Sequence, residues 1–330
     1  MKKIGIVGYG GIGPIHAKAL EQVRQGKLYA VCDIDPDRRK LCREQYGVVE
    51  YEDFDAMLAD SQVDSVHICT PHYLHFAMVK KALAAGKDVV VEKPVTRIRR
   101  EWEELRGLEG ADRVCVVLQN RLNPCVQKLR GLIQAGELGS VKAVRGMLTW
   151  NRDKAYYDSA RWRGNWDTEG GGLLINQAIH TLDFFSYLVG DIKNVRADMC
   201  NHTLEGVIEV EDTLAAHLEF AGGIKGVLFA TNGYGENSSP FLEVAFEQGL
   251  ARYLDQKLWV NGQLAAEDCP ATSGKAYWGN GHEKLIQRYY DEGKYFSLAD
   301  AANTMETVFA MYEDAARGRK LFFENYFKNC

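Results

Sequence analysis

Three glycines near the start of the chain have the spacing of a phosphate-binding turn. Gly8, Gly10 and Gly13 follow the apolar run Lys3–Val7 and introduce a helical pattern at Ile12–Gln22. In a strand–turn–helix unit the first glycine makes the turn, the second lets the backbone approach a pyrophosphate, and the third lets helix and strand pack closely. The N–H groups at the helix start add a positive potential for phosphates. The segment predicts a dinucleotide site, and the alternative is an ordinary glycine-rich turn.

An acidic residue stands where the adenosine ribose of a dinucleotide would lie. Asp33 ends the second apolar run, 20 residues after Gly13. A carboxylate there can accept hydrogen bonds from the ribose hydroxyls, and it would repel a 2′-phosphate. We therefore expect NAD, while Arg38 and Arg39 could offset the charge and leave NADP open. Asp33 could instead serve as a turn or helix N-cap residue, because Asp35 and the proline after it also look like a helix start.

A second group of polar residues lies in the other half of the chain. Asn176, His180 and Asp183 are spaced i, i+4 and i+7 in the otherwise apolar helical pattern Leu173–Leu188. That spacing predicts one shared helix face. Polar groups on a packed face need polar partners, because burying them unpaired is costly. An imidazole, with an ordinary pKa of about 6.5, suits proton exchange, although His180 could be a satisfied core residue. Asp183 is expected to tie the helix to a neighbouring element.

The elements that would position these residues alternate over the first 120 residues. Short runs rich in Val and Ile alternate with helical stretches, which predicts a parallel sheet covered on both faces. Right-handed crossovers then give a doubly wound arrangement. The expected strands are Lys3–Val7, Leu28–Cys32, Ser65–Cys69, Asp88–Val91 and Val114–Leu118, and the expected helices are Ile12–Gln22, Pro36–Gln45, Tyr73–Ala85 and Ile98–Leu108.

The pattern changes after about residue 123. Residues 151–172 are rich in Trp, Tyr, Arg, Asp and Gly and have little periodicity, as in a functional loop. Strand-like runs then follow one another without helices, which favours antiparallel pairing. The expected helices are Pro124–Ala135, Leu173–Leu188, His282–Tyr290 and Leu298–Arg317, and the expected strands are Val141–Trp150, Val195–Thr203, Thr213–Phe220, Ile224–Thr231 and Leu242–Phe246.

The predicted fold class is therefore α/β with two domains. Residues 1–122 would form a Rossmann domain with a doubly wound parallel sheet that binds NAD(P). Residues 123–330 would form an α+β domain with a large, mostly antiparallel open sheet. We expect this second domain to bind substrate and to form oligomers, and its last helix could pack back on the first domain.

Further motifs are similar to one known family. The strand at Asp88–Val91 is followed by Glu92-Lys93-Pro94, and the strand at Ser65–Cys69 by Thr70-Pro71-His72-Tyr73-Leu74-His75. The long loop ends in Gly170-Gly171-Gly172, and the helix after it carries His180 and Asp183. With the N-terminal glycines, these motifs resemble the Gfo/Idh/MocA family, which includes glucose-fructose oxidoreductase and inositol dehydrogenase. The resemblance implies an NAD(P)-dependent oxidoreductase that acts on a sugar, a cyclitol or a sugar derivative.

The resemblance also implies roles for individual residues. Lys93 and His180 would face the nicotinamide as catalytic residues, with His180 as the base and Lys93 hydrogen-bonded to the same oxygen. Asn176 departs from the aspartate of many members and would orient His180 or a hydroxyl group without carrying a charge. Expected cofactor-binding residues are Gly8, Gly10, Gly11, Ile12, Gly13, Asp33, Thr70, Pro71, His75, Glu92 and Lys93. Expected substrate-binding residues are Lys93, Arg163, Asn176, Gln177 and His180, with Tyr156 as a further candidate.

Two other functions fit the same motifs. One is a glycosidase or lyase with bound NAD, in which transient oxidation of the sugar enables elimination and no net NADH is formed. The other is a non-catalytic NAD(P)-binding regulator. The presence of both Lys93 and His180 weighs against the regulator, since a sensor needs neither residue.

Composition narrows the partners. The formal net charge of −5 argues against nucleic acid or an anionic membrane, and no apolar stretch reaches the roughly 18 residues of a membrane span. The eight cysteines are scattered without CxxC spacing, which favours a cytoplasmic protein without disulfides or a bound metal. An open sheet covered on one face only would leave apolar surface exposed, so we expect a homodimer or homotetramer.

Overall fold

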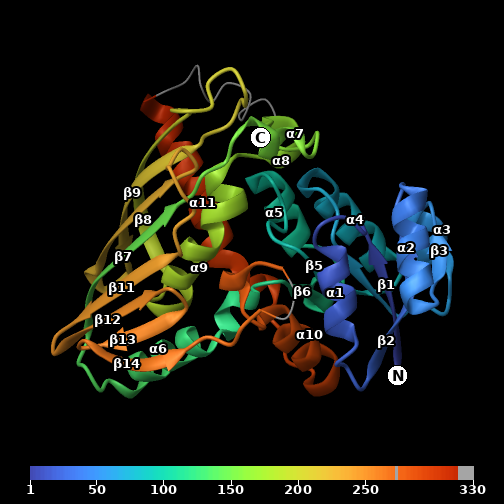
Figure 1. Cartoon of the computed structure of the whole chain (residues 1–330), viewed down its shortest axis with the longest axis horizontal. Coiled ribbons are helices and arrows are strands. Elements are labelled where there is room, and N and C mark those ends of the chain that lie inside the picture. The colour runs from blue at the N-terminus through green and yellow to red at the C-terminus, as the bar shows by residue number, and fades with distance from the viewer. Residues whose placement is uncertain (272–273, 319–330) are drawn as a thin grey trace. The chain divides into compact units, whose positions relative to one another are not determined.

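The computed structural model describes residues 1–271 and 274–318 (Figure 1). Their contacts divide the chain into two compact units. The first contains Met1–Thr96, Arg100–Gln119 and Ala271–Ala301, and the second contains Arg97–Arg99, Asn120–Pro270 and the chain from Ala302 onward. No helix in the described part of the chain has the length and apolarity needed to cross a membrane.

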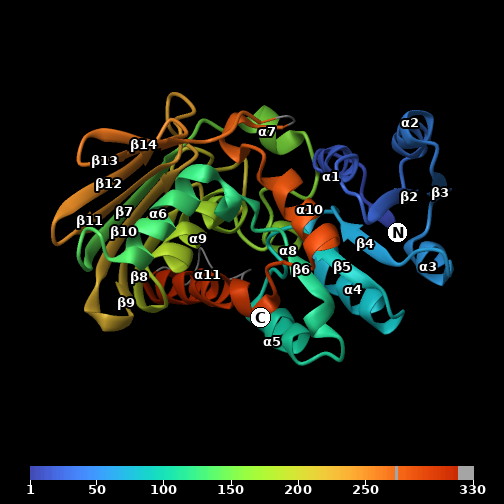
Figure 2. The same cartoon turned by 90° about the horizontal axis from the view of Figure 1, so that it is seen from below.

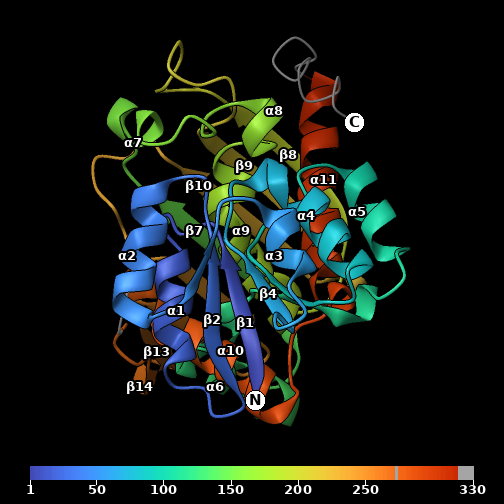
Figure 3. The same ribbon diagram turned by 90° about the vertical axis from the view of Figure 1, so that its right-hand side faces the viewer.

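The first unit contains a six-stranded parallel sheet in the order β3-β2-β1-β4-β5-β6. Side chains on both faces of β1, β4 and β5 are buried, and most of them are Val or Ile, as expected for strands between two helix layers. In Figure 3, α1 and α2 lie to one side of the strands and α3 and α4 to the other, so the predicted doubly wound sheet is confirmed. The strands are β1 (Lys2–Val7), β2 (Gly26–Cys32), β3 (Val49–Tyr51), β4 (Ser65–Ile68), β5 (Asp88–Val91) and β6 (Val114–Val116).

Two short elements of this unit were not predicted. The edge strand β3 has three residues and no fully buried one, and α3 (Phe54–Ala59) has six; both are too short for a clear period. A segment distant in sequence also joins the unit, because α10 packs against α1. The remaining helices are α1 (Gly13–Leu20), α2 (Pro36–Tyr46), α4 (His72–Ala84), α5 (Arg99–Arg106) and α10 (Gly281–Glu292), with short 3-10 turns at Ala111–Arg113, Gln119–Leu122 and Ala276–Trp278.

The second unit contains an eight-stranded sheet in the order β14-β13-β12-β11-β7-β10-β9-β8. Among the described strands of this sheet only β7 and β10 pair in parallel, so the predicted mostly antiparallel sheet is confirmed. The strands are β7 (Val141–Thr149), β8 (Ile192–Cys200), β9 (Thr213–Phe220), β10 (Lys225–Thr231), β11 (Phe241–Phe246), β12 (Gly249–Leu254), β13 (Lys257–Val260) and β14 (Gln263–Glu267). The last three were not predicted, although the Asn261-Gly262 pair between β13 and β14, both with positive φ, is a strong sequence signal for a hairpin turn.

Helices cover one face of this sheet. Helix α6 contacts β13 and β14, and α9 contacts β7; Figures 1 and 2 show these helices and α11 gathered on the same side. The opposite face is open, because alternate residues of β9 and β10 are exposed. The helices are α6 (Pro124–Ala135), α7 (Lys154–Asp158), α8 (Trp166–Glu169), α9 (Ile179–Leu188) and α11 (Leu298–Gly318), with a π-turn at Leu174–Ala178 and a 3-10 turn at Ala221–Gly223.

A buried ion pair fixes α9 within the second unit. Asp183 accepts two hydrogen bonds from Arg121, at 2.8 and 2.6 Å, and one from the hydroxyl of Thr304 at 2.8 Å. Both ionic side chains are almost fully buried. The expectation that Asp183 ties its helix to a neighbouring element is confirmed, since the contacts reach the turn before α6 and also α11.

Replacing Asp183 with Asn should destabilise the protein strongly. The change leaves the buried guanidinium of Arg121 opposite a neutral amide, and breaking a buried pair from one side typically costs about 3–5 kcal/mol. The measurement is the free energy of unfolding in urea. Asp158→Asn is the control, because the Lys154–Asp158 pair is exposed and should contribute less than about 1 kcal/mol. Equal stability of the two variants would show that the Arg121–Asp183 pair is not an anchor.

Candidate active site

The glycine turn of the first unit has no room for side chains at two positions. Gly8 has a φ of +86°, and a Cβ there would lie 2.8 Å from the carbonyl carbon of Cys69. A Cβ on Gly13 would lie 2.4 Å from the carbonyl oxygen of Gly8. At Gly11, by contrast, nothing lies within 4 Å of the Cβ position. The turn is therefore tightly packed underneath and open above, as a backbone surface for phosphates requires.

Asp33 braces this turn. Its carboxylate is 7% exposed and accepts the backbone N–H of Tyr9 at 2.6 Å and that of Asp35 at 2.9 Å. The N-cap of α2 is Asp35, so the alternative of Asp33 as the N-cap is wrong. The guanidinium of Arg38 lies 3.9 Å from Asp33 Oδ2.

The residues present fit a dinucleotide. The open glycine backbone lies beside the start of α1, and Asp33 holds a carboxylate at the end of β2 with acceptor capacity beyond its two backbone hydrogen bonds. The next residue, Ile34, is 85% exposed and offers an apolar surface for an adenine ring. Ile34 was not among the predicted site residues, although an isoleucine between two aspartates at a strand end is a visible signal.

The loops after β4 and β5 are joined by His75. This buried ring places Nδ1 2.7 Å from the carbonyl oxygen of Pro94 and Nε2 2.8 Å from that of Thr70. Burial lowers the pKa of His75, so the ring is neutral and donates from one nitrogen at a time. His75 thus acts as a brace between the loops that carry Thr70, Pro71 and Lys93. Its direct contact with the cofactor stays a prediction.

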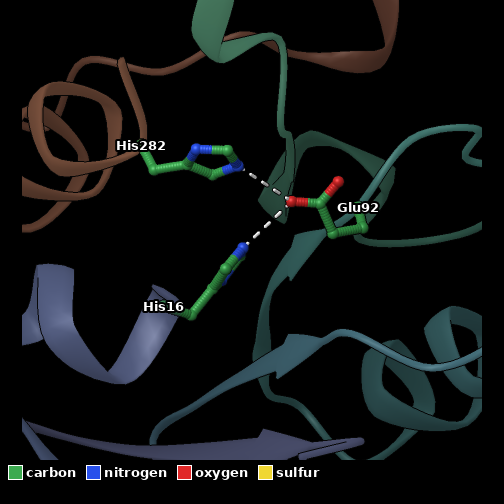
Figure 4. Close-up of side chains that lie close together, drawn as sticks. All are labelled: His16, Glu92 and His282. Atoms are coloured by element: carbon green, nitrogen blue, oxygen red, sulfur yellow. Dashed lines mark hydrogen bonds and ion pairs between the residues drawn. The ribbon is translucent and has the colours of Figure 1, made fainter. Parts of the chain in front are cut away.

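Glu92 fixes the backbone that presents Lys93. Its Oε2 accepts the N–H of Lys93 at 3.2 Å, while Oε1 lies 3.0 Å from His16 Nε2 and 3.4 Å from His282 Nε2 (Figure 4). Burial raises the pKa of Glu92, but the two facing imidazoles outweigh it and hold the pKa well below its ordinary range. Glu92 is therefore an anion, and Lys93 follows it as a half-buried side chain at the same edge of the sheet as the glycine turn.

A chain of buried hydrogen bonds extends from Glu92. His16 Nδ1 lies 2.9 Å from His67 Nδ1, His67 Nε2 lies 2.8 Å from the Tyr290 hydroxyl, and that hydroxyl lies 2.8 Å from Ser65 Oγ. Burial lowers the pKa of His67 well below its ordinary value, so this ring is neutral. One proton assignment then satisfies every group, with Ser65 donating to Tyr290, Tyr290 to His67, His67 to His16, and His16 to Glu92.

The same cluster has the spacing of a metal site. The ligand atoms of His16, Glu92 and His282 all lie within 4.8 Å of one another. The proton assignment above satisfies His16 and Glu92 with hydrogen bonds alone, and His282 adds its contact with the carboxylate. Hydrogen bonds therefore account for His16 and Glu92 without a cation, and the absence of a metal cofactor stays a prediction.

A second turn with no room for side chains begins the helix that carries His180. A Cβ on Gly171 would lie 2.0 Å from the Tyr312 hydroxyl, and one on Gly172 would lie 2.2 Å from the carbonyl oxygen of Glu211. The buried carboxyl of Glu211 accepts the N–H groups of Gly172 and Leu174, both at 2.9 Å. Burial raises the pKa of Glu211 to about 7. These contacts fix where the helix starts and hence where its polar residues lie.

The helix after this turn is not a regular α-helix. Leu174–Ala178 forms a π-turn before α9, a distortion often found at functional sites. Asn176 and His180 are half-buried, while the other residues from 171 to 185 are buried. Asp183 lies in the regular helix α9 three residues after His180 but is buried in its ion pair with Arg121, while the π-helical turn changes the spacing of Asn176 to both residues. The two remaining residues do form the accessible polar part of the helix.

Polar side chains of the long loop meet this helix. Gln177 donates to the Tyr156 hydroxyl at 3.1 Å, and Arg163 donates to the same hydroxyl with its guanidinium 4.4 Å from the ring centroid. Asn232 donates to the Tyr157 hydroxyl at 3.1 Å and approaches Gln177 Oε1 at 3.4 Å. The structure thus brings the predicted Arg163, Gln177 and Tyr156 together. Tyr157 and Asn232 were missed, and no motif marks Asn232 in the sequence.

Comparisons with known proteins agree with this architecture. A family model described as "Oxidoreductase family, NAD-binding Rossmann fold" matches residues 2–121, and one described as "GFO/IDH/MocA C-terminal domain" matches residues 126–252.

Several named proteins resemble the chain over different lengths. D-apiose dehydrogenase of Rhizobium rhizogenes is 27% identical over 96% of both chains. Myo-inositol 2-dehydrogenase of Thermotoga maritima is 28% identical over 68% of this chain and 67% of its own. The match to the Bacillus subtilis oxidoreductase YrbE is 26% identical and spans 65% of that protein. Among solved structures, the WlbA dehydrogenase of Chromobacterium violaceum, in complex with NADH and UDP-GlcNAcA, has a TM-score of 0.82 and 28% identity over 96% of this chain and 94% of its own.

Replacing Asp33 with Asn should change the choice of cofactor. Asn offers one acceptor oxygen to two backbone N–H groups and no longer repels a 2′-phosphate. We expect NADH to bind about tenfold more weakly, since hydrogen bonds to charged groups contribute about 1.5–3 kcal/mol, and the preference for NADH over NADPH to fall. Fluorescence titration with both cofactors measures this. In the control, Arg38→Ala should weaken only NADPH binding. An unchanged preference in Asp33→Asn would show that Asp33 does not select the cofactor.

Proposed function

Because the chain belongs to the Gfo/Idh/MocA family of NAD-binding oxidoreductases, we propose that it is an NAD-dependent dehydrogenase or reductase that transfers a hydride at a CH–OH or carbonyl carbon of a sugar, cyclitol or sugar derivative. The observation that carries the proposal is the position of Lys93. Its backbone is held by the buried Glu92 carboxylate, at the same sheet edge as the glycine turn and Asp33. Ligands of open α/β sheets bind outside this edge.

The second unit supports a polyhydroxylated substrate. Tyr156, Arg163, Gln177 and Asn232 form a connected set of donors, acceptors and an aromatic ring. Sites of this kind discriminate by hydrogen-bonding substrate hydroxyls. The relatives named as acting on D-apiose and myo-inositol agree with this class.

In the mechanism that we propose, NAD supplies the hydride acceptor in the oxidative direction. His180 accepts the proton of the reacting hydroxyl, because imidazole exchanges protons near neutral pH. The Lys93 ammonium donates a hydrogen bond to the same oxygen and stabilises the negative charge that develops there. Asn176, one turn before His180, orients the imidazole or a substrate hydroxyl. In the reductive direction the protonated His180 returns this proton to the carbonyl oxygen, while Lys93 keeps its hydrogen bond to the same oxygen.

The test is a coupled screen followed by a variant. The chain is incubated with NAD or NADP and with polyols, aldoses, cyclitols and nucleotide sugars, and NADH absorbance is followed. Lys93→Met should then lower turnover by at least about 100-fold, as for other positioned acid–base groups, while NADH binding stays unchanged. Lys80→Met, at an exposed lysine of α4, is the control and should keep full activity.

Each outcome separates the alternatives. Retention of more than about a tenth of the activity in Lys93→Met would contradict the assignment of Lys93. Release of an aglycone without net NADH would indicate the redox-cycling glycosidase. NADH binding with no turnover of any substrate class would indicate a regulator.

We further propose that the chain is a cytoplasmic homo-oligomer. The seven cysteines in the described residues are free thiols, as expected in a reducing compartment. On the open face of the second sheet, Met147 pairs beside Phe229, and Val227 lies two residues before Phe229. All three are 39–44% exposed. They form an apolar strip on a face that no helix among the described residues of this unit covers, and a second copy of the chain would bury it.

Charge placed on this strip should separate the copies. Val227→Asp with Phe229→Asp is expected to reduce the mass measured by light scattering to that of one chain, 37.1 kDa, while far-UV circular dichroism stays unchanged. Lys225→Asp, at an exposed charged position of the same strand, is the control. A wild-type mass of one chain would overturn the proposal.

A further inference from the structure

A buried carboxyl group lies directly behind Asn176. Glu169 ends the short helix α8 and is fully buried. Its Oε2 accepts the backbone N–H of Gly164 at 2.5 Å, and its Oε1 accepts the side-chain amide of Asn176. Glu169 has no part in the proposed mechanism and was not among the predicted site residues.

The hydrogen bond to Gly164 does not by itself require a carboxyl group at position 169. A neutral amide at residue 169 would also accept the Gly164 N–H, without the cost of burying a charge. Burial raises the pKa of Glu169 to about 7, although the contacts with Asn176, Gly164 and Arg163 act in the opposite direction. A titratable group is thus retained one hydrogen bond away from a proposed catalytic residue.

We propose that Glu169 is a positioning residue whose carboxylate fixes the amide of Asn176, so that Asn176 presents its carbonyl oxygen on the side away from Glu169 to the substrate hydroxyl or to His180. The proposal rests on the proposed function, in which Asn176 and His180 contact the reacting group.

The direction of the amide follows from proton counting. A carboxylate only accepts hydrogen bonds, so Asn176 must turn its Nδ2 toward Glu169 and its Oδ1 to the opposite side. Asn176 lies four residues before His180, and both are half-buried where their neighbours are buried. A protonated Glu169 can donate instead, and it then permits the reversed amide with Oδ1 toward residue 169. The productive orientation therefore belongs to the anionic form and is lost as pH falls through about 7.

The charged and titratable groups around Glu169 act in both directions. Arg163 favours the anion, while the buried carboxyl of Glu211 opposes it. Tyr157 stays neutral, because burial and then the charge of Glu169 raise the pKa of its hydroxyl. The pKa of Glu211 is itself raised to about 7 by burial, so both carboxyl groups change charge near neutral pH.

The first test does not depend on turnover. In the full chain with 15N-labelled asparagine, the side-chain NH₂ signal of Asn176, assigned by its loss in Asn176→Ala, should shift with a midpoint near pH 7. The shift should disappear in Glu169→Gln and persist in Asp167→Asn, which changes an exposed carboxylate on the same helix. An Asn176 signal that does not titrate in the wild type would overturn the proposal.

The second test is kinetic. Glu169→Gln keeps the volume and the acceptor for Gly164, but its NH₂ group then faces Asn176 and favours the reversed amide, with Oδ1 toward residue 169. We expect kcat/KM to fall about tenfold, in the range of a lost charge-assisted hydrogen bond, with NADH binding unchanged. Asn176→Asp alone places two carboxyl groups in contact and should also lose activity, because like charges at this distance do not both ionise. The double variant Glu169→Gln with Asn176→Asp again has one carboxylate facing one amide, and it should recover most of the lost kcat/KM.

The outcomes distinguish this proposal from the proposed function. A wild-type kcat/KM in Glu169→Gln would overturn the positioning role. So would a double variant whose loss in kcat/KM equals the product of the losses in the two single variants. If Lys93→Met is inactive at the same time, the proposed function stands without it. If no substrate class turns over, the titration of Asn176 still decides whether Glu169 sets its orientation.

Discussion

A buried carboxylate is costly unless oriented donors surround it, and this constraint shapes three of the turns that lead to candidate residues. Asp33 holds the glycine turn through Tyr9, Glu92 holds Lys93, and Glu211 holds the start of the helix that leads to His180. In each case the donors include backbone N–H groups, so the acid fixes main chain as well as any side chain that it contacts. A backbone held in this way presents its side chains with little freedom, as a site that must align a substrate requires.

The buried acids of the two units differ in their pKa values. In the first, two imidazoles face Glu92 and hold its pKa well below the ordinary range. The carboxylate that holds the backbone of Lys93 therefore stays ionised across neutral pH. In the second, Glu169 and Glu211 have mainly neutral donors, and burial raises both pKa values to about 7. Protonation near neutral pH thus acts on the unit that carries Asn176 and His180.

Local patterns in the sequence predicted the parts of the site that local geometry determines. The positions of Gly8, Gly13 and Asp33 follow from one strand–turn–helix unit, and the structure shows the packing that requires the two glycines. The two sheets were also predictable. Helical patterns separate the strand-like runs in the first half of the chain, which indicates a parallel sheet, and most strand-like runs of the second half follow one another directly, which indicates antiparallel pairing. The specific roles of Lys93, His180 and Asn176 stay predictions that rest on the family resemblance.

Contacts between residues distant in sequence escaped prediction for a physical reason. His16 and Glu92 are 76 residues apart, and Arg121 and Asp183 are 62 apart. Neither pair has a periodic signal, since each forms only when separate elements pack. Glu169 is only seven residues from Asn176, but the contact passes through the turn before the helix and a π-turn, neither of which regular helical spacing describes. Irregular backbone near functional residues is where pattern-based inference fails.

The contact between Glu169 and Asn176 also gives a physical reason for an asparagine rather than an aspartate at position 176. An aspartate at position 176 would face a buried carboxyl group, and the pair would share one proton rather than carry two charges. Asparagine removes that conflict and leaves a single negative charge, placed on Glu169 behind the helix. From there the charge acts on the active-site side chains through the direction of one amide. On the proposed role of Glu169, positions 169 and 176 are one functional unit, and the departure at Asn176 moves a charge rather than deleting it.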